Sequence, residues 1–384
     1  MSVTTPGGFR ASGVTAGLKA SGRPDVALVV NDGPRFDAAA VYTSNRCTAN
    51  PVRWSVQASA DGVVHAVLLN SGGANCYTGP AGFEVTRASA HQVAAALGIR
   101  AEDVVVCSTG MIGEPIVAPR LATGITAALG ALSGDGGEDA ATAIMTTDTR
   151  AKNAAVTDPA GWSVGGMAKG AGMIAPGLAT MLVVLTTDAV AEAAVLDGAL
   201  RAATRRTFDR LDGDGCMSTN DTVVLLASGA SGIAPSPESL GAAVHAVCHD
   251  LAMQLIDDAE GAAHVITLEV VGAADEADAL EVGHAVARSN LFKCAIFGQD
   301  PNWGRILAAV GTTAARFEPD ALDVAINGVW VCRDGQPGES RSLIDLSGRQ
   351  VAVRIDLKAG DVAATVWTND LTHDYVHENS AYST

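Results

Sequence analysis

The sequence predicts an α/β protein, because short strands and longer helices alternate along the chain. Aliphatic runs such as 104–106 and 181–185 are typical of buried strands, whereas residues 238–255 repeat apolar side chains with the period of a helix. Hydrophobic residues make up 48% and charged residues 17% of the 384, which indicates a folded globular chain. This length suits two domains or one large α/β unit.

Charge and composition exclude several classes of partner. The net charge of −17 at pH 7 repels nucleic acid and anionic membrane surfaces, and it tolerates a cationic small substrate. Aromatic residues are only 4% while glycine numbers 42, so the core must be packed from Ala, Val, Leu and Ile with many tight turns.

The seven cysteines are scattered along the chain, and their number is odd. No CxxC pair or His/Cys cluster has the spacing of a metal site, and we find neither a signal sequence nor an apolar run of about 20 residues. We therefore expect reduced thiols, no bound metal and a soluble cytoplasmic protein.

In the first half of the chain, alternating apolar residues and turn residues predict strands that flank one clear helix. The expected strands cover 26–30, 38–42, 63–70 and 104–107, and the expected helix covers 86–97.

In the second half, Asp188 is the expected N-cap of an alanine-rich helix that ends near Arg206, and a long helix begins near Glu238. Further elements are expected as strands at 223–227 and 264–271, a helix at 280–287, an extended segment at 290–298 and a polar turn at 299–306. Strands and turns then alternate to the C-terminus.

The most informative stretch joins a glycine-rich segment to an apolar strand. Residues 165–172 hold Lys169 among glycines, a Pro176-Gly177 turn follows, and 181–185 are aliphatic or Met. Thr180 therefore lies where a loop meets a rigid strand, and a strand end holds a reactive side chain firmly. The alternative is a buried strand that merely begins with threonine.

A threonine hydroxyl becomes a good nucleophile only beside a base. If Thr180 is the first residue of a chain, its own α-amine, with a pKa of about 8, serves as that base. This requires cleavage of the Ala179–Thr180 bond. The Thr180 hydroxyl can attack the Ala179 carbonyl, and hydrolysis of the resulting ester then frees the new N-terminus.

Two further segments are candidates for ligand contacts. Ser108-Thr109-Gly110 ends a strand, and a hydroxyl followed by a glycine N–H can form a pair of oxyanion donors, although many ordinary strands end in the same way. The small-residue loop 70–79 predicts close backbone approach, either to a ligand or to another chain segment.

Other motifs fail on spacing. The calcium-like loop at Asp212 has Val223 where a twelfth-position Glu is needed. His245 and His249 lack the His-Glu-x-x-His pattern, so we interpret them as structural or solvated. Lys169 is followed by glycine, unlike a Walker lysine, and no GxGxxG motif follows a strand.

The segment 167–182 resembles the self-cleavage segment of the ornithine acetyltransferase family, also called bifunctional glutamate N-acetyltransferase/amino-acid acetyltransferase. Supporting segments agree in order and spacing over the whole chain. They are Asn70-Ser-Gly, Ser108-Thr-Gly-Met-Ile-Gly, Met145-Thr-Thr-Asp-Thr, Ser218-Thr-Asn-Asp-Thr, Glu260-Gly-Ala, Asp300-Pro-Asn-Trp-Gly-Arg and Asn379-Ser-Ala-Tyr-Ser-Thr.

The resemblance implies an acyltransferase of arginine biosynthesis that moves an acetyl group from N-acetyl-L-ornithine to L-glutamate through an acetyl-threonine. It implies a distinct fold of layered mixed sheets and helices, with N-terminal-nucleophile chemistry and no metal or organic cofactor. It also implies cleavage into an α chain, 1–179, and a β chain, 180–384, which assemble as an α2β2 heterotetramer. Acetyl-CoA stays open as a second acetyl donor.

Position by position, the resemblance makes Thr180 the nucleophile and makes Thr109 and Gly110 the oxyanion donors. The substrate-contacting positions are Thr146, Lys169, Thr180, Glu260, Asn379 and Thr384. Lys169 can pair with a substrate carboxylate, and Asn379 and Thr384 can hold the amino-acid end. Two roles stay open for Glu260: it orients the α-amine or binds the substrate's cationic group.

Two other functions compete with this interpretation. A self-processed amidase or aminopeptidase would use water in place of glutamate as the acceptor. A non-enzymatic binding protein for small amino acids would have no reason to break at Ala179–Thr180.

Overall fold

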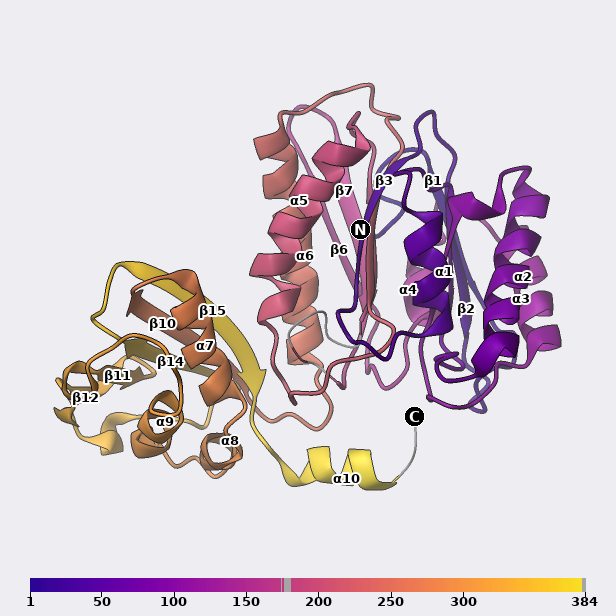
Figure 1. The fold of residues 1–384 in the computed structure, drawn as a ribbon. Coiled ribbons are helices and arrows are strands. Elements are labelled where there is room, and N and C mark those ends of the chain that lie inside the picture. Colours follow the sequence, from indigo (N-terminus) through magenta and orange to yellow (C-terminus); the bar gives the residue numbers. More distant parts are fainter. Residues whose placement is uncertain (174, 176–180, 382–384) are drawn as a thin grey trace.

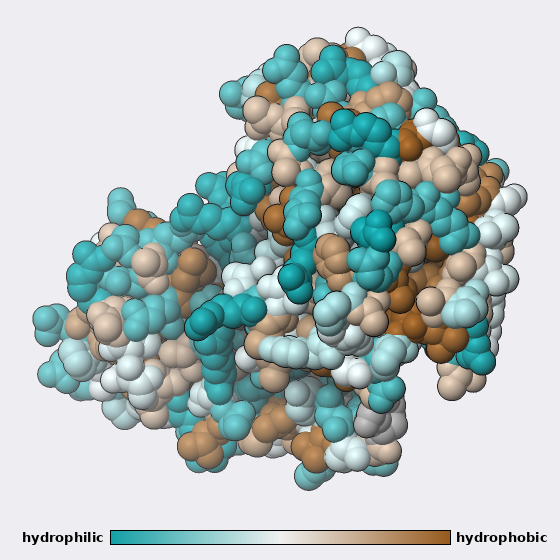
Figure 2. Space-filling model, turned by 45° about the vertical axis from the view of Figure 1, so that its right-hand side comes forward, coloured by the Kyte–Doolittle hydropathy of each residue, from teal (hydrophilic) through white to brown (hydrophobic). Residues whose placement is uncertain are grey.

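The computed structural model describes residues 1–173, 175 and 181–381. The chain forms a larger lobe that contains two sheets and a smaller lobe that contains a third sheet (Figure 1). The space-filling view has a mostly hydrophilic surface, in keeping with the net charge of −17 (Figure 2).

The first sheet of the larger lobe has four strands in the order β1-β2-β4-β5, and β4 and β5 run parallel. Its strands are β1 (Phe9–Val14), β2 (Val26–Asn31), β4 (Ala66–Asn70) and β5 (Val104–Ser108). An apolar core joins its outer face to α1 (Asn50–Ala58), α2 (Gly79–Leu97) and α3 (Ala118–Gly130).

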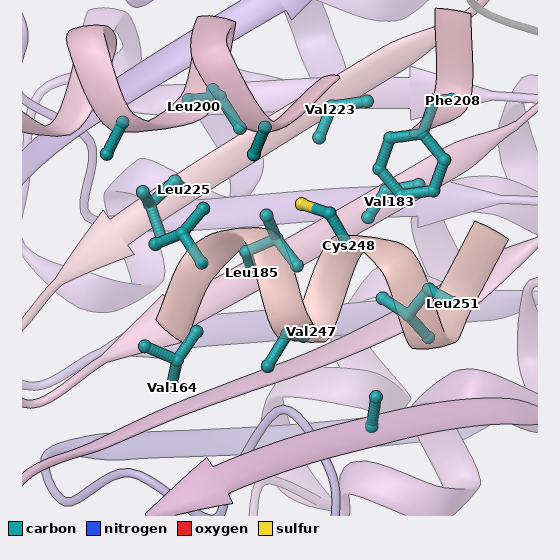
Figure 3. Close-up of a cluster of buried hydrophobic side chains, with 14 of the residues drawn as sticks. Val164, Val183, Leu185, Leu200, Phe208, Val223, Leu225, Val247, Cys248 and Leu251 are labelled. Carbon is teal, nitrogen blue, oxygen red and sulfur yellow. The ribbon is translucent and has the colours of Figure 1, made fainter. Parts of the chain in front are cut away.

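The second sheet has five strands in the order β3-β9-β8-β7-β6. Its strands are β3 (Asp37–Tyr42), β6 (Lys152–Thr157), β7 (Ser163–Lys169), β8 (Leu182–Thr187) and β9 (Thr222–Ala227). Its outer face is covered by α5 (Ala193–Arg206) and α6 (Pro237–Asp257). Val247, Cys248 and Leu251 of α6 lie in this core with Leu185 and Leu225 of the sheet (Figure 3).

A third apolar core lies between the two sheets. It joins Val67 and Leu69 of the first sheet to Val184 and Leu226 of the second, and α4 (Gly137–Ala143) packs into the same core. The order of layers is therefore helices, sheet, sheet, helices. This arrangement confirms the layered α/β fold predicted from the sequence.

The smaller lobe holds a six-stranded mixed sheet in the order β13-β12-β11-β14-β10-β15. Its strands are β10 (Val265–Ala273), β11 (Asp323–Ile326), β12 (Val329–Arg333), β13 (Gln336–Pro337), β14 (Gln350–Asp356) and β15 (Val362–Asn369). The helices packed with it are α7 (Glu276–Ala287), α8 (Asn290–Phe297) and α9 (Trp303–Val310). After β15, α10 (His373–Ala381) leads the chain back toward the larger lobe (Figure 1).

Short 3-10 turns complete the described elements, at Ala101–Asp103, Phe208–Arg210, Pro319–Ala321 and Arg341–Leu343. Within the described residues, no helix is both long and apolar enough to cross a membrane. All seven cysteines are free.

Four sequence predictions of local structure were wrong. Strands and turns do not alternate as far as the C-terminus, because residues 373–381 form helix α10. Residues 290–297 form helix α8, because the Ser289 hydroxyl accepts the Phe292 N–H as an N-cap and the apolar side chains at 292, 295 and 296 share one buried face. The polar turn at 299–306 gives way to α9 at Trp303. Asp188 caps no helix: α5 has its N-cap at Glu192, and the Asp188 carboxylate instead accepts the backbone N–H groups of Gly7 and Ser163.

Candidate active site

Ends of strands from both sheets of the larger lobe meet at one place. Lys169 ends β7 and pairs with Leu182 at the start of β8, and Leu182 pairs with Thr222 at the start of β9. In the facing sheet, β4 and β5 end side by side at Asn70 and Ser108. In the sequence, residue 180 precedes β8 by two positions, and it lies outside the described residues.

Lys169 and Thr109 contact each other across the two sheets. The Lys169 Nζ donates a hydrogen bond of 3.3 Å to the Thr109 Oγ1, and both side chains are buried. Because the Thr109 oxygen accepts this bond, its own hydrogen stays available to donate elsewhere. That is the requirement for an oxyanion donor.

Gly110 has a backbone that only glycine adopts without strain. Its φ is +129°, and an added Cβ would lie 2.7 Å from the Gly73 nitrogen. Within the described part of the chain, the Gly110 N–H has no hydrogen-bond acceptor. The loop at Asn70 therefore approaches another chain segment closely, one of the two outcomes that its small residues predict.

A buried ion network lies behind Lys169. The Lys152 Nζ contacts Asp148 Oδ1 at 2.6 Å and Asp258 Oδ2 at 2.5 Å, and all three side chains are almost fully buried. Burial alone would raise the pKa of the Asp148 carboxyl, but Lys169 and Lys152 lower it to about 2. Burial lowers the pKa of the Lys169 ammonium, and Asp148 opposes that change.

The predicted substrate residue Thr146 lies on the same network. Its backbone N–H donates to Asp148 Oδ2 at 2.9 Å, and the Gly170 N–H donates to Asp148 Oδ1 at 2.7 Å. Asp148 is thus hydrogen-bonded both to the Thr146 segment and to the segment that follows Lys169.

Glu260 and Asn379 come together from distant parts of the chain. The Asn379 Nδ2, on α10, donates to Glu260 Oε2 at 3.0 Å, and the Glu260 N–H donates to the Ala171 carbonyl at 2.9 Å. The carboxylate lies directly against Gly172, where an added Cβ would be 2.6 Å from either oxygen. Glu260 also acts electrostatically on Lys169, so these predicted residues share one neighbourhood.

Glu260 lines two cavities. One, of about 350 Å³, is also lined by Ala171 and Lys293, and the other, of about 790 Å³, is also lined by Thr147 and Asp258. Thr109 and Lys169 line neither cavity, although the Glu260 charge interacts electrostatically with Lys169. Glu260 therefore lies between the cavities and the buried polar groups at the strand ends.

Three predicted positions, Ala179, Thr180 and Thr384, lie outside the described residues. The first described residue after them in the chain is Met181, whose N–H donates to Asp221 Oδ1 at 3.1 Å. Thr109, Gly110, Thr146, Lys169, Glu260 and Asn379 are the predicted positions that the structure describes.

Sequence reasoning missed three buried polar residues at this junction: Asp148, Asn220 and Asp221. Asp221 Oδ2 has no hydrogen-bond partner among the described residues, and burial raises the pKa of this carboxyl well above its usual range. Both short motifs that contain these residues were visible in the sequence, at 145–149 and 218–222. Their positions within the motifs gave no sign of which side chains point inward.

The rejected metal motifs keep structural roles. The carboxylate of Asp212 accepts His284 Nδ1 and Arg288 Nε, each at 2.8 Å. His245 and His249 stack with ring centroids 6.1 Å apart. In the described part of the chain, no group of three or more His, Cys, Asp or Glu is placed to hold a metal ion.

Comparison with known proteins covers the full chain. A model of the ArgJ family matches residues 10–384. The arginine biosynthesis bifunctional protein ArgJ of Streptomyces avermitilis is 62% identical over 383 residues, and the alignment covers 100% of both chains. The protein of the same name from Thermobifida fusca is 60% identical over 384 residues, again with 100% of both chains covered.

Among solved structures, the ornithine acetyltransferase of Mycobacterium tuberculosis complexed with ornithine is 49% identical. That match covers 47% of this chain and 96% of the solved chain, with a TM-score of 0.45.

The layered fold and the polar strand ends define an α/β enzyme that acts on small molecules. The full-length matches then fix its family. The chain belongs to the ArgJ family. This confirms the family predicted from the sequence, and with it the class of enzyme, an acyltransferase of arginine biosynthesis.

Proposed function

We propose that this enzyme transfers the acetyl group of N-acetyl-L-ornithine to L-glutamate through an acetyl ester on Thr180. The observation that carries the proposal is the contact between Lys169 and Thr109 at the edge where β8 begins. It supports the proposal because an amine and a hydroxyl that could serve the reaction lie beside the strand that follows residue 180 in the sequence. The name and ornithine ligand of the Mycobacterium tuberculosis relative point to the same chemistry.

Self-cleavage comes first. The Thr180 hydroxyl attacks the Ala179 carbonyl, the acyl group moves from nitrogen to oxygen, and water hydrolyses the ester. The products are an α chain of residues 1–179 and a β chain of residues 180–384 whose first residue carries a free α-amine. The two chains assemble as an α2β2 heterotetramer.

Acetyl transfer follows in two half-reactions. The Thr180 Oγ attacks the acetyl carbonyl while the α-amine takes its proton, and Thr109 and Gly110 stabilise the oxyanion. The C–N bond breaks, the leaving amine takes the proton, and ornithine departs. The amine of glutamate then attacks the acetyl ester, which releases N-acetylglutamate and restores Thr180.

Substrate binding uses the groups around the ion network. Lys169 pairs with a substrate carboxylate, and Thr146, Asn379 and Thr384 hold the amino-acid end. Glu260 orients the α-amine or binds the cationic end of the donor. The reaction needs no metal or organic cofactor, and acetyl-CoA serves as an alternative donor if the enzyme has both activities of the family.

The test is the variant Thr180→Ala. It should remain one uncleaved chain of 38.8 kDa with no transferase activity, whereas the wild type gives two fragments on a denaturing gel. Two fragments from the variant would remove Thr180 from the mechanism. Acetate release from acetylornithine in the absence of glutamate would instead favour the competing amidase.

A further inference from the structure

Two adjacent buried residues, Asn220 and Asp221, contact opposite sides of the proposed site. They come directly before β9, and they are 4% and 0% exposed. β9 belongs to the five-stranded sheet, whereas the oxyanion residues follow β5 of the four-stranded sheet. A fixed distance between nucleophile and oxyanion donors therefore requires a connection between two different sheets.

Asn220 makes that connection on the oxyanion side. Its Nδ2 donates to the carbonyl of Ser108 at 2.8 Å and to the carbonyl of Ala74 at 2.6 Å. Its Oδ1 accepts the Thr219 hydroxyl at 2.6 Å, so every polar atom of the amide is used. The Ser108 carbonyl belongs to the peptide bond that leads into Thr109.

The Ala74 carbonyl lies in the loop after β4, which is hydrogen-bonded to the loop of Thr109 and Gly110. The backbone N–H of Ala74 donates to the Met111 carbonyl at 3.1 Å, and the Gly73 N–H donates to the Thr109 carbonyl at 3.0 Å. Asn220 thus donates hydrogen bonds both to the segment that carries Thr109 and Gly110 and to the loop after β4 that contacts this segment.

Asp221 makes the connection on the nucleophile side. Its Oδ1 accepts the Met181 N–H at 3.1 Å, and β8 and β9 pair in parallel directly beyond this contact, with Leu182 opposite Thr222. The Met181 nitrogen is bonded to the carbonyl carbon of Thr180. A group that fixes this nitrogen therefore fixes one end of the nucleophilic residue.

The geometry points to Asn220 and Asp221 as a positioning pair that sets the distance between the Thr180 hydroxyl and the Thr109–Gly110 oxyanion donors. This inference rests on the proposed function of Thr180. Both residues act through others, Asn220 through the carbonyls of Ser108 and Ala74 and Asp221 through the Met181 N–H. Displacement of a reacting group by about 1 Å is enough to lower a rate about 10²-fold.

The chain offers matched controls at the opposite ends of the same strands. The Nδ2 of Asn31 also bridges two backbone carbonyls, those of Arg35 at 3.0 Å and Ala227 at 3.1 Å, and so joins the same two sheets beyond β9. Asp188, beyond β8, accepts backbone N–H groups as Asp221 does. Asn31→Ala and Asp188→Ala remove similar bonds far from the site.

The test compares the full-length variants Asn220→Ala and Asp221→Ala with these controls for self-cleavage, kcat, KM and thermal midpoint. Asn220→Ala should cleave slowly and lose about 10²-fold in kcat, with KM within about threefold because the substrate-binding side chains are unchanged. Asp221→Ala should lose as much, and Asp221→Asn should recover most of the rate because its amide oxygen can still accept the Met181 N–H. Both controls should lower the midpoint and keep the wild-type kcat.

Loss of kcat in the controls equal to that in the pair would overturn the inference, as would wild-type kcat in Asn220→Ala or Asp221→Ala. If the alanine variants fail to fold, Asn220→Asp preserves the shape and opposes the two carbonyls with acceptors, so wild-type kcat in that variant also refutes the positioning role. A wild-type enzyme that neither cleaves nor transfers acetyl would refute the proposed function itself. That outcome is separate because it appears before any variant is compared.

Discussion

Gly172→Ala tests whether the position of Glu260 matters for catalysis. The added Cβ would lie 2.6 Å from both Glu260 carboxylate oxygens. Ordinary contact begins near 3.4 Å, so the carboxylate must withdraw by roughly 0.8 Å. Because it is the end of a flexible side chain, it can move without unfolding the protein.

The movement has a calculable effect. It breaks or stretches the 3.0 Å bond from Asn379 Nδ2 to Glu260 Oε2, which is worth about 1 kcal/mol in stability. If Glu260 contacts substrate as proposed, a displacement near 1 Å costs about 10²-fold in rate. We therefore expect a folded, self-cleaved enzyme whose kcat/KM for acetyl transfer falls about 10²-fold.

A second glycine supplies the control. Gly241 lies in α6 with open space around the position of an added Cβ. Gly241→Ala should keep wild-type kcat/KM and gain up to about 1 kcal/mol in stability, since alanine is the better helix former. If Gly172→Ala were as active as Gly241→Ala in the same transfer assay, the position of the Glu260 carboxylate would be irrelevant and the reasoning would be refuted.

Two further predictions concern the buried ion network. The pKa of Asp148 is about 2 in the folded protein against 3.8 for an unperturbed aspartate, so its ionisation stabilises the fold above pH 4 by about 2 kcal/mol, and this contribution is lost as pH falls toward 2. Asp148→Asn should therefore have a lower free energy of unfolding than wild type at pH 7. In chemical unfolding, this difference should narrow from pH 4 to pH 2, and a difference that does not change with pH would contradict a contribution from Asp148 ionisation. Lys169→Met should lose about 10²-fold in kcat/KM yet stay folded at pH 7. It also removes one of the two cations that lower the Asp148 pKa, so acid unfolding should begin at higher pH than in wild type, and an unchanged acid midpoint would count against that coupling.

The hydrophobic pattern of the sequence predicted the elements whose apolar residues are continuous or regularly spaced. The run 181–185 became the core of β8, and the helical period beginning at Glu238 became α6. The helix at 290–297 was missed because the charged Lys293 lies among its buried apolar positions, and its N-cap, Ser289, precedes no obvious helical period. Capping and packing of one face decided its structure.

The site was predictable only as a set of positions. Motif resemblance named Thr109, Lys169 and Glu260, but nothing in their spacing predicts that Lys169 donates to Thr109 from a different sheet. That contact depends on strand order, in which β9 lies between β3 and β8 although it follows both in the chain. Asn220 was overlooked because its partners become neighbours only when the two sheets face each other. Asp221 was overlooked because Met181 becomes its neighbour only through the pairing of β8 with β9.

In the proposed two-step reaction, one site must bind two substrates whose side chains carry opposite charges. Acetylornithine carries a cationic side chain and glutamate an anionic one, so a pocket of one sign would bind one substrate at the expense of the other. The 350 Å³ cavity is lined by charges of both signs: the acids are Asp214, Glu260 and Asp370, and the bases are Arg288 and Lys293. The two basic side chains reduce the preference for a cationic substrate that the carboxylates alone would give the cavity. Burial lowers the pKa of the Lys293 ammonium. In the proposed reaction, Lys169 is the group that both substrates share, because each presents a carboxylate next to the nitrogen that exchanges the acetyl group.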